Sequence, residues 1–113
     1  MGIFDFFRKT KVPQISVQEA HKKLQDDKTV IIVDVRQPSE TKSGVVPGAI
    51  LIPLTEFDQR MSELPRGKPI LTICQSSHRS PFAARKLSGA GYDVCNVSGG
   101  MNAWRKAGLP VKR

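Results

Sequence analysis

Cysteines, histidines and long apolar runs are scarce or lacking in this sequence, and each scarcity argues against a class of protein. Two cysteines among 113 residues cannot form the disulfide framework of a small secreted domain, so we expect a reducing, cytoplasmic setting. No zinc-ligand spacing is found, and His21 has no second ligand near it, so we expect no metal site. No run approaches the roughly 20 apolar residues that a membrane-spanning helix needs.

The length and the composition indicate one globular domain. The chain is 39% apolar and 25% charged, and its 113 residues leave no room for a second core. Its net charge of +8 raises the question of a nucleic-acid partner. The basic residues are spread along the chain, however, and no aromatic-rich RNA-binding signature accompanies them. We therefore expect no nucleic-acid partner, and only a general attraction for small anions or acidic partners.

Residues 1–12 have the character of an N-terminal tail attached to a domain that covers residues 13–113. The tail combines four bulky apolar residues with three basic ones: Ile3, Phe4, Phe6, Phe7, Arg8, Lys9 and Lys11. Such a segment is either an amphipathic membrane anchor, a flexible tail, or a tail whose aromatic residues fold back on the domain. One short helical turn binds membranes weakly, so we favour a tail without membrane association.

Apolar runs and helix signals alternate along the domain. Nearly continuous apolar segments predict strands at 30–35, 49–52, 69–73 and 94–97. Capping residues, helical periodicity and Pro or Gly boundaries predict helices at 16–27, 38–44, 55–64, 80–90 and 101–106. This alternation predicts an α/β fold, in which a parallel sheet carries helices on both faces.

Cys74 stands between the apolar run 69–73 and the start of a predicted helix, with Ser80 as the expected N-cap and Pro81 at the first helical position. Amide groups at a helix start are unpaired, and the helix dipole is positive there. That environment favours an anion and lowers the pKa of a thiol. We therefore predict that Cys74 is a nucleophile that carries a negatively charged adduct.

Asp34 and Arg36 close another predicted strand and lie on one of its faces. The ligand crevice of a parallel α/β sheet lies beyond the carboxyl ends of its strands, where Cys74 is also expected. The two charged residues either hold a loop as an ion pair or belong to the site, and we favour the structural ion pair.

Several motifs in the order found here resemble the rhodanese family of single-domain sulfurtransferases. The match runs from about Ile15 to Val111 and rests on Asp34-Val35-Arg36, Glu40, Val46-Pro47-Gly48-Ala49-Ile50, the loop 74–80, Gly99-Gly100-Met101-Asn102-Ala103-Trp104 and Ala107-Gly108-Leu109-Pro110-Val111. The resemblance implies a central five-stranded parallel sheet flanked by helices. It also implies that Cys74 takes a sulfane sulfur from a small anionic donor such as thiosulfate. The resulting persulfide would pass that sulfur to cyanide or to a thiol, with no separate cofactor.

The resemblance also assigns roles to residues around Cys74. Backbone amides of the following loop would bind the persulfide, and Asp34 and Arg36 would support that loop; its members are Gln75, Ser76, Ser77, His78, Arg79 and Ser80. Arg79 either supplies positive charge to the incoming anion or pairs with a carboxylate, and both roles stay open. We expect His78 at the mouth of the site rather than as a direct base.

Two positions depart from the family pattern. The family usually has glycine at the position of Ser77, where backbone freedom helps the loop to curl, so loop shape or activity is expected to differ. The histidine that often precedes the Pro-Gly turn is replaced by Val45, which removes a polar group without touching the nucleophile.

Two other classes of function share a reactive cysteine or this fold with the sulfurtransferases. Cysteine phosphatases and arsenate reductases place one residue more between Cys and Arg than the four found between Cys74 and Arg79, so we expect neither activity. A persulfide carrier or a protein-binding module on the same fold remains an alternative. Cys95 would be a resolving thiol in such chemistry, but its apolar strand favours a buried structural role.

Overall fold

The computed structural model describes residues 12–113, which contain a parallel sheet with the strand order β1-β5-β4-β2-β3. Its five strands are β1 (Gln14–Ile15), β2 (Ile31–Asp34), β3 (Ile50–Leu51), β4 (Ile70–Ile73) and β5 (Val94–Val97). All neighbouring strands are parallel. The predicted α/β class and the five-stranded parallel sheet are therefore confirmed, with β4 at the centre of the sheet.

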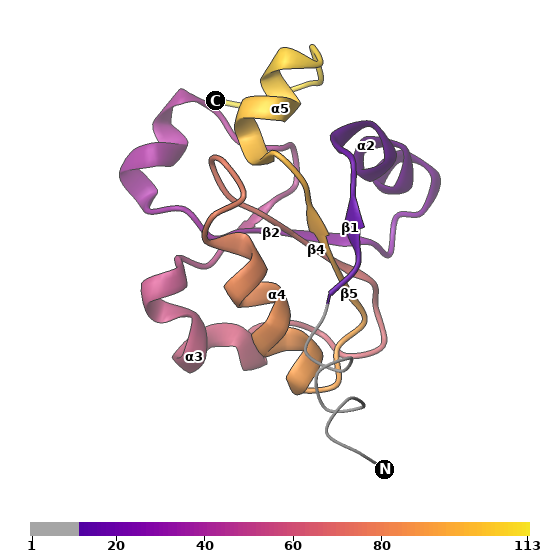
Figure 1. Cartoon of the computed structure of the whole chain (residues 1–113), viewed down its shortest axis with the longest axis vertical. Helices are drawn as coiled ribbons and strands as arrows, with labels where there is room; N and C mark the ends of the chain where they lie inside the picture. The colour runs from indigo at the N-terminus through magenta and orange to yellow at the C-terminus, as the bar shows by residue number, and fades with distance from the viewer. Residues whose placement is uncertain (1–11) are drawn as a thin grey trace.

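Helices cover both faces of this sheet, as Figure 1 shows. The α-helices are α2 (Val17–Asp26), α3 (Phe57–Arg60), α4 (Ser80–Gly89) and α5 (Gly100–Lys106), and the 3-10 segments are η1 (Pro38–Ser43), η2 (Leu54–Glu56) and η3 (Met61–Glu63). Each face of the sheet has its own buried apolar cluster. One cluster contains residues of α3 and α4, and the other contains residues of α2 and α5. Apolar strands buried on both faces are what such a parallel sheet requires.

Alternation along β4 decides which side chain meets which cluster. Ile70 and Cys74 belong to the cluster on the α4 side, whereas Leu71 and Ile73 belong to the cluster on the α5 side. Trp104 is fully buried in the second cluster, and its ring nitrogen donates to the carbonyl of Pro110 at 2.8 Å. The sheet therefore carries Cys74 into the α3–α4 face of the domain.

Some predicted element boundaries are confirmed and others are wrong. The capping box at Ser16 and Glu19 is present, because the Glu19 amide donates to the Ser16 hydroxyl at 3.1 Å. The predicted helix 55–64 is instead three short pieces, η2, α3 and η3. The Thr55 hydroxyl caps none of them and accepts a hydrogen bond from the side-chain amide of Gln37 at 3.0 Å. Strand β1 was not predicted, since two residues are too few to show a period.

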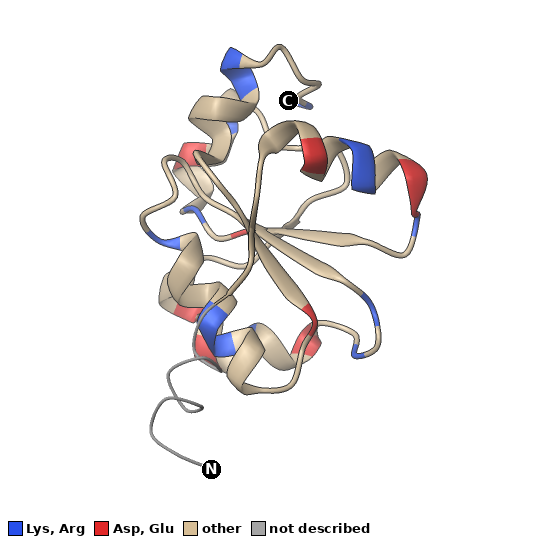
Figure 2. Cartoon of the chain, turned by 45° about the vertical axis from the view of Figure 1, so that its right-hand side comes forward, with Lys and Arg blue, Asp and Glu red and all other residues tan. Residues whose placement is uncertain are grey.

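The predicted N-terminal tail lies outside the described residues except for Val12. Within residues 12–113, no helix is long and apolar enough to cross a membrane. The basic residues of this part of the chain lie on several separate elements (Figure 2).

Candidate active site

Cys74 is the first residue after β4, and it is fully buried at the carboxyl end of the sheet. The neighbouring strand β2 ends level with it, because Asp34 is in register with Ile73. The backbone of Val35 continues this pairing by donating to the carbonyl of Ile73 at 3.0 Å. The sheet thus brings together the two strand ends at which the sequence predicted site residues.

The loop after Cys74 rests on the N-terminus of α5. The carbonyls of Cys74 and Gln75 accept from the amides of Met101 and Asn102, at 2.8 and 3.0 Å. Gly100 allows this close approach, because a Cβ at its position would collide with the carbonyl of Cys74. Because α5 binds the first two carbonyls of the loop, the amides of the loop are free to point toward the Cys74 sulfur.

The Cys74 thiol has a lowered pKa. Burial alone would raise the pKa, since a buried thiolate loses its hydration. Hydrogen bonds from the hydroxyl and amide of Ser80, and from the amides of Arg79 and Ser76, act in the opposite direction and outweigh burial. The loop therefore favours the thiolate, which is the nucleophilic form of cysteine.

Ser80 does not cap the helix, which corrects the sequence prediction. Arg79 is the N-cap, without a side-chain hydrogen bond, and Ser80 is the first residue of α4. The Ser80 hydroxyl is buried and has no oxygen or nitrogen partner within residues 12–113, so the Cys74 sulfur, whose pKa it lowers, is the one group left for it to bond. A buried hydroxyl without a partner is costly, and a thiolate at Cys74 would supply its acceptor.

Ser77 adopts a left-handed backbone conformation, with φ of 67°. This region is open to glycine and costs other residues about 1–2 kcal/mol. Serine thus takes up here the backbone conformation that glycine favours, and the expected effect of Ser77 on loop shape or activity stays a prediction. Its hydroxyl accepts a hydrogen bond from the Asn96 side chain at 3.0 Å.

Arg79 forms a two-pronged ion pair with Glu40 of η1. The two nitrogen–oxygen distances are 2.6 and 2.7 Å, and both side chains are about one-third exposed. The hydrogen bonds from Arg79 are the main reason why the pKa of Glu40 falls to about 2. Of the two roles left open for Arg79, the structure favours the one in which it pairs with a carboxylate.

Asp34 and Arg36 form a fully buried ion pair at 2.7 Å. Arg36 also donates to the carbonyls of Glu40 and Gly44 and to the side chain of Gln75 at 3.1 Å. All of these groups belong to loops around Cys74, so the pair connects the end of β2 to η1 and to the loop. The geometry agrees with the supporting role that the resemblance implied.

His78 is exposed, and its ring bonds the hydroxyl of Ser76 at 2.7 Å rather than the sulfur. Cys95 lies on the other face of the sheet from Cys74, in contact with the α2–α5 cluster. Both cysteines are free thiols, and burial raises the pKa of Cys95. Cys95 is therefore poorly placed to act as a resolving thiol.

Sequence reasoning missed contributions that depend on distant partners. Gly100 and Asn102 were noted only as motif letters, although both contact the loop, since Asn102 also accepts from the Gln75 side chain at 2.6 Å. Asn96 was interpreted as part of an apolar strand. Its partners Ser77 and Gln14 are 19 and 82 positions away, so no local pattern could have revealed it.

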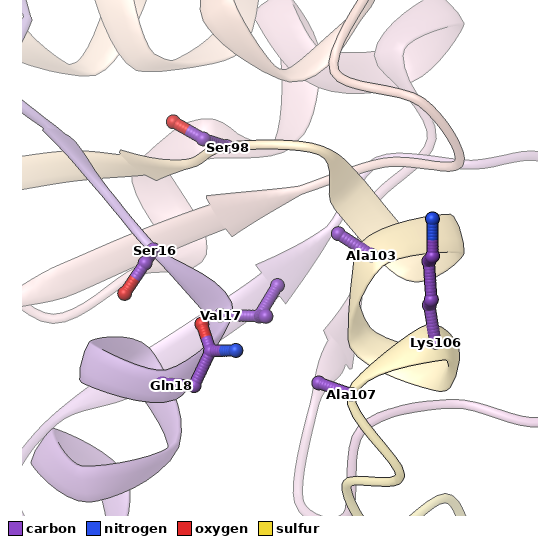
Figure 3. Close-up of a pocket in the computed structure, with 7 residues that line it drawn as sticks. All are labelled: Ser16, Val17, Gln18, Ser98, Ala103, Lys106 and Ala107. Carbon is purple, nitrogen blue, oxygen red and sulfur yellow. The ribbon is translucent and has the colours of Figure 1, made fainter.

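An open cleft lies elsewhere on the molecule, between the start of α2 and α5. Figure 3 shows its lining residues, Ser16, Val17, Gln18, Ser98, Ala103, Lys106 and Ala107, and its volume is about 360 Å³. It is on the face opposite α4 and contains no thiol, so we do not assign the chemistry to it. Among residues 12–113, no group of three His, Cys, Asp or Glu side chains could hold a metal ion.

Known proteins resemble this chain over nearly its whole length. The family model described as the rhodanese-like domain matches residues 16–107. A sulfurtransferase of Allochromatium vinosum is 36% identical over 101 residues, which are 88% of this chain and 94% of that protein. The putative sulfur carrier protein YrkF of Bacillus subtilis is also 36% identical, over 84% of this chain, but the match spans only 52% of that longer protein.

A solved structure gives the same result. The rhodanese-related protein of Thermoplasma volcanium superposes with a TM-score of 0.83 at 30% identity, covering 88% of this chain and 97% of that one. Matches of this extent in sequence and structure establish common membership, and the named relatives support a sulfurtransferase or sulfur carrier role. The chain belongs to the rhodanese-like domain family.

Proposed function

We propose that this protein is a sulfurtransferase that carries a sulfane sulfur as a persulfide on Cys74. The observation that carries the proposal is the environment of the Cys74 sulfur, which is buried and yet has a lowered pKa because its own loop donates hydrogen bonds to it. The same donors would stabilise the terminal anion of a persulfide, as an oxyanion hole stabilises an oxygen anion. The family relationship supports this class of chemistry.

The first step would load the protein with sulfur. The Cys74 thiolate attacks the outer sulfur of thiosulfate and forms a new sulfur–sulfur bond. The original sulfur–sulfur bond of thiosulfate breaks, and its electron pair leaves with sulfite. Cys74 is then a persulfide anion, and the Ser80 hydroxyl and the amides of Ser76 and Arg79 are its donors.

The second step would discharge the sulfur. A thiophile such as cyanide attacks the outer sulfur of the persulfide, the bond to Cys74 breaks, and thiocyanate leaves with the Cys74 thiolate restored. A small thiol or the cysteine of a protein acceptor would react in the same way. The sulfur is carried by Cys74 itself, so neither step requires a metal or an organic cofactor.

The size of the loop argues against phosphate chemistry. Only Gln75, Ser76, Ser77 and His78 stand between the nucleophile and Arg79. The arginine, moreover, is held by Glu40 rather than free to clamp a tetrahedral anion. We therefore expect no hydrolysis of a phosphate ester such as p-nitrophenyl phosphate.

Thiocyanate formation from thiosulfate and cyanide tests the proposal. We expect turnover by the wild-type protein and by Cys95→Ser, and no turnover by Cys74→Ser, because only Cys74 has the donor environment. Normal turnover by Cys74→Ser would overturn the proposed nucleophile. Phosphate-ester hydrolysis that depends on Cys74, without thiocyanate formation, would overturn the proposed reaction class.

The likeness to a putative sulfur carrier favours a second candidate, a persulfide carrier that delivers sulfur to one protein. The two candidates share the loading step and differ in the discharge. A carrier would retain its persulfide in the presence of cyanide or dithiothreitol and release it only to its acceptor. Rapid discharge to these small thiophiles, measured by loss of the added sulfur mass, would support the enzyme.

A further inference from the structure

The middle of the Cys74 loop contains an unusual backbone conformation. Among residues 12–113, Ser77 is the one non-glycine residue with a positive φ, at 67°. It stands three residues after the nucleophile, between the amide donors of Ser76 and Arg79. The conformation of Ser77 therefore affects the direction in which these two amides point.

A row of polar side chains, which runs from the buried centre of the sheet to its exposed edge, lies beside this residue. Thr72, Asn96 and Gln14 occupy adjacent positions on the neighbouring strands β4, β5 and β1, as the strand registers show. Thr72 and Asn96 are both fully buried. Because side chains alternate along a strand, Thr72 faces the same side of the sheet as Cys74 two residues later.

The Asn96 side chain is fixed by three partners. Its carbonyl oxygen accepts from the Thr72 hydroxyl at 3.1 Å, and its amide nitrogen donates to Gln14 at 2.8 Å. The second hydrogen of that nitrogen is donated to the Ser77 hydroxyl at 3.0 Å. Thr72 and Gln14 therefore orient the Asn96 amide, and the amide holds the loop through Ser77.

We propose that Asn96 is a positioning residue that holds Ser77 in its left-handed conformation and thereby directs the loop amides toward the sulfur of Cys74. Glycine would need no such anchor, because it enters this conformation readily. Serine requires a compensating contact, and Asn96 supplies it from the sheet. The inference rests on the proposed role of Cys74 and adds a residue outside the loop that sets its reactivity.

A purely structural role for Asn96 makes a different prediction. If Asn96 only satisfied buried polar groups, its loss would lower stability equally whether residue 77 is serine or glycine. If it positions Ser77, the effect of Asn96→Ala on Cys74 should depend on the residue at position 77. A double-mutant cycle between the two positions measures this dependence.

The readout is the rate of Cys74 alkylation by iodoacetamide as a function of pH, measured in a Cys95→Ser background so that one thiol reacts. We expect Asn96→Ala to slow alkylation at pH 7 about tenfold, equivalent to about 1.4 kcal/mol. In the background of Ser77→Gly, we expect the same substitution to slow it less than about twofold. Equal slowing in both backgrounds would overturn the proposal.

Two further variants keep the test decisive. Ser77→Ala leaves the sheet untouched and removes the acceptor, so it should slow alkylation to a similar extent even if Asn96→Ala does not fold; unchanged alkylation would contradict the proposal. Thr72→Val removes one of the bonds that orient Asn96 but leaves the contact with Ser77, so it should lower the melting temperature and slow alkylation less than Asn96→Ala does. A loss as large as that of Asn96→Ala would indicate general loosening and overturn the positioning role.

Alkylation does not involve sulfur transfer, so the inference and the proposed function can fail separately. A wild-type protein that shows the expected cycle but never forms a persulfide would refute the function and retain the positioning role. A protein that forms the persulfide but shows no coupling between Asn96 and Ser77 would refute the positioning role alone.

Discussion

The reactivity of Cys74 depends on a balance between burial and hydrogen bonding. A fully buried thiol is normally inert, because the thiolate loses its hydration there. Ser80 changes this balance at close range, since both its hydroxyl and its amide act on the sulfur. A hydrogen bond to a charged group contributes about 1.5–3 kcal/mol, which is enough to compensate for much of the cost of burial.

The substitution Ser80→Ala should therefore raise the pKa of Cys74. The loss of one charge-assisted hydrogen bond to the thiolate predicts a higher midpoint for alkylation as a function of pH. Ser88→Ala, at the other end of the same helix, serves as the control and should leave the midpoint unchanged. An unchanged midpoint in Ser80→Ala would show that the hydroxyl does not stabilise the thiolate.

Glu40 makes the stability of the protein depend on pH. Its pKa is lowered from 4.5 to about 2 in the folded protein, mainly by hydrogen bonds from Arg79. The stabilisation is therefore fully present above pH 4.5 and is lost as the pH falls through about 2. Because the pair is partly exposed, we expect it to contribute only about 1 kcal/mol.

The variant Glu40→Gln tests this contribution, since glutamine resembles the protonated acid. Chemical denaturation should give a lower free energy of unfolding for the variant at pH 6, and the difference should shrink as the pH approaches 2. The exposed pair Arg60–Glu63 provides a control, and Glu63→Gln should have a smaller effect. A difference for Glu40→Gln that stays constant between pH 6 and pH 2 would refute the linkage.

At the scale of elements, the active-site loop depends on the contact with α5. The amides of Met101 and Asn102 hold the loop carbonyls, and Gly100 leaves the space for this contact. The substitution Gly100→Ala places a methyl group against the carbonyl of Cys74. It also strains a backbone with φ of 60°.

We expect Gly100→Ala to destabilise the protein by about 2–4 kcal/mol, the sum of overpacking and left-handed strain. Gly67→Ala is a matched control, because its φ is 82° and no atom lies within 4 Å of the added methyl group. It should cost only about 1 kcal/mol. Equal losses in thermal or chemical denaturation would show that the contact with the loop is not tight.

The parts of the fold that could be predicted from the sequence are those that depend on local patterns. Strands β2 and β4 were found because each is a nearly continuous apolar run buried on both faces. Polar residues follow each run, and this pattern predicted that the carboxyl ends of both strands lie at the site. The capping box of α2 was found because Ser16 and Glu19 are three residues apart and need no distant partner.

The errors in the site prediction have a common physical origin. Ser80 has the residue type and spacing of an N-cap, but its hydroxyl is directed to the sulfur, a distinction that only the curled loop creates. The Glu40–Arg79 pair joins residues 39 positions apart, and Asn96 and Ser77 are 19 apart. Side-chain contacts over such separations leave no periodic signal in the chain.

For the molecule as a whole, the sheet separates the two thiols. Cys74 faces the α3–α4 cluster, whereas Cys95 contacts the α2–α5 cluster on the other face. Register places Cys95 beside Leu71, three residues before Cys74 along β4, which corresponds to about 10 Å of strand. One thiol should therefore carry the added sulfur without forming a disulfide with the other.

Intact-protein mass spectrometry after incubation with thiosulfate tests this account most directly. We predict that the wild-type protein and Cys95→Ser gain the mass of one sulfur atom, and that dithiothreitol removes it. Cys74→Ser should gain no mass, because the donor environment surrounds that sulfur alone. A sulfur adduct on Cys74→Ser, or its loss in Cys95→Ser, would contradict the assignment of Cys74 as the sulfur-carrying nucleophile.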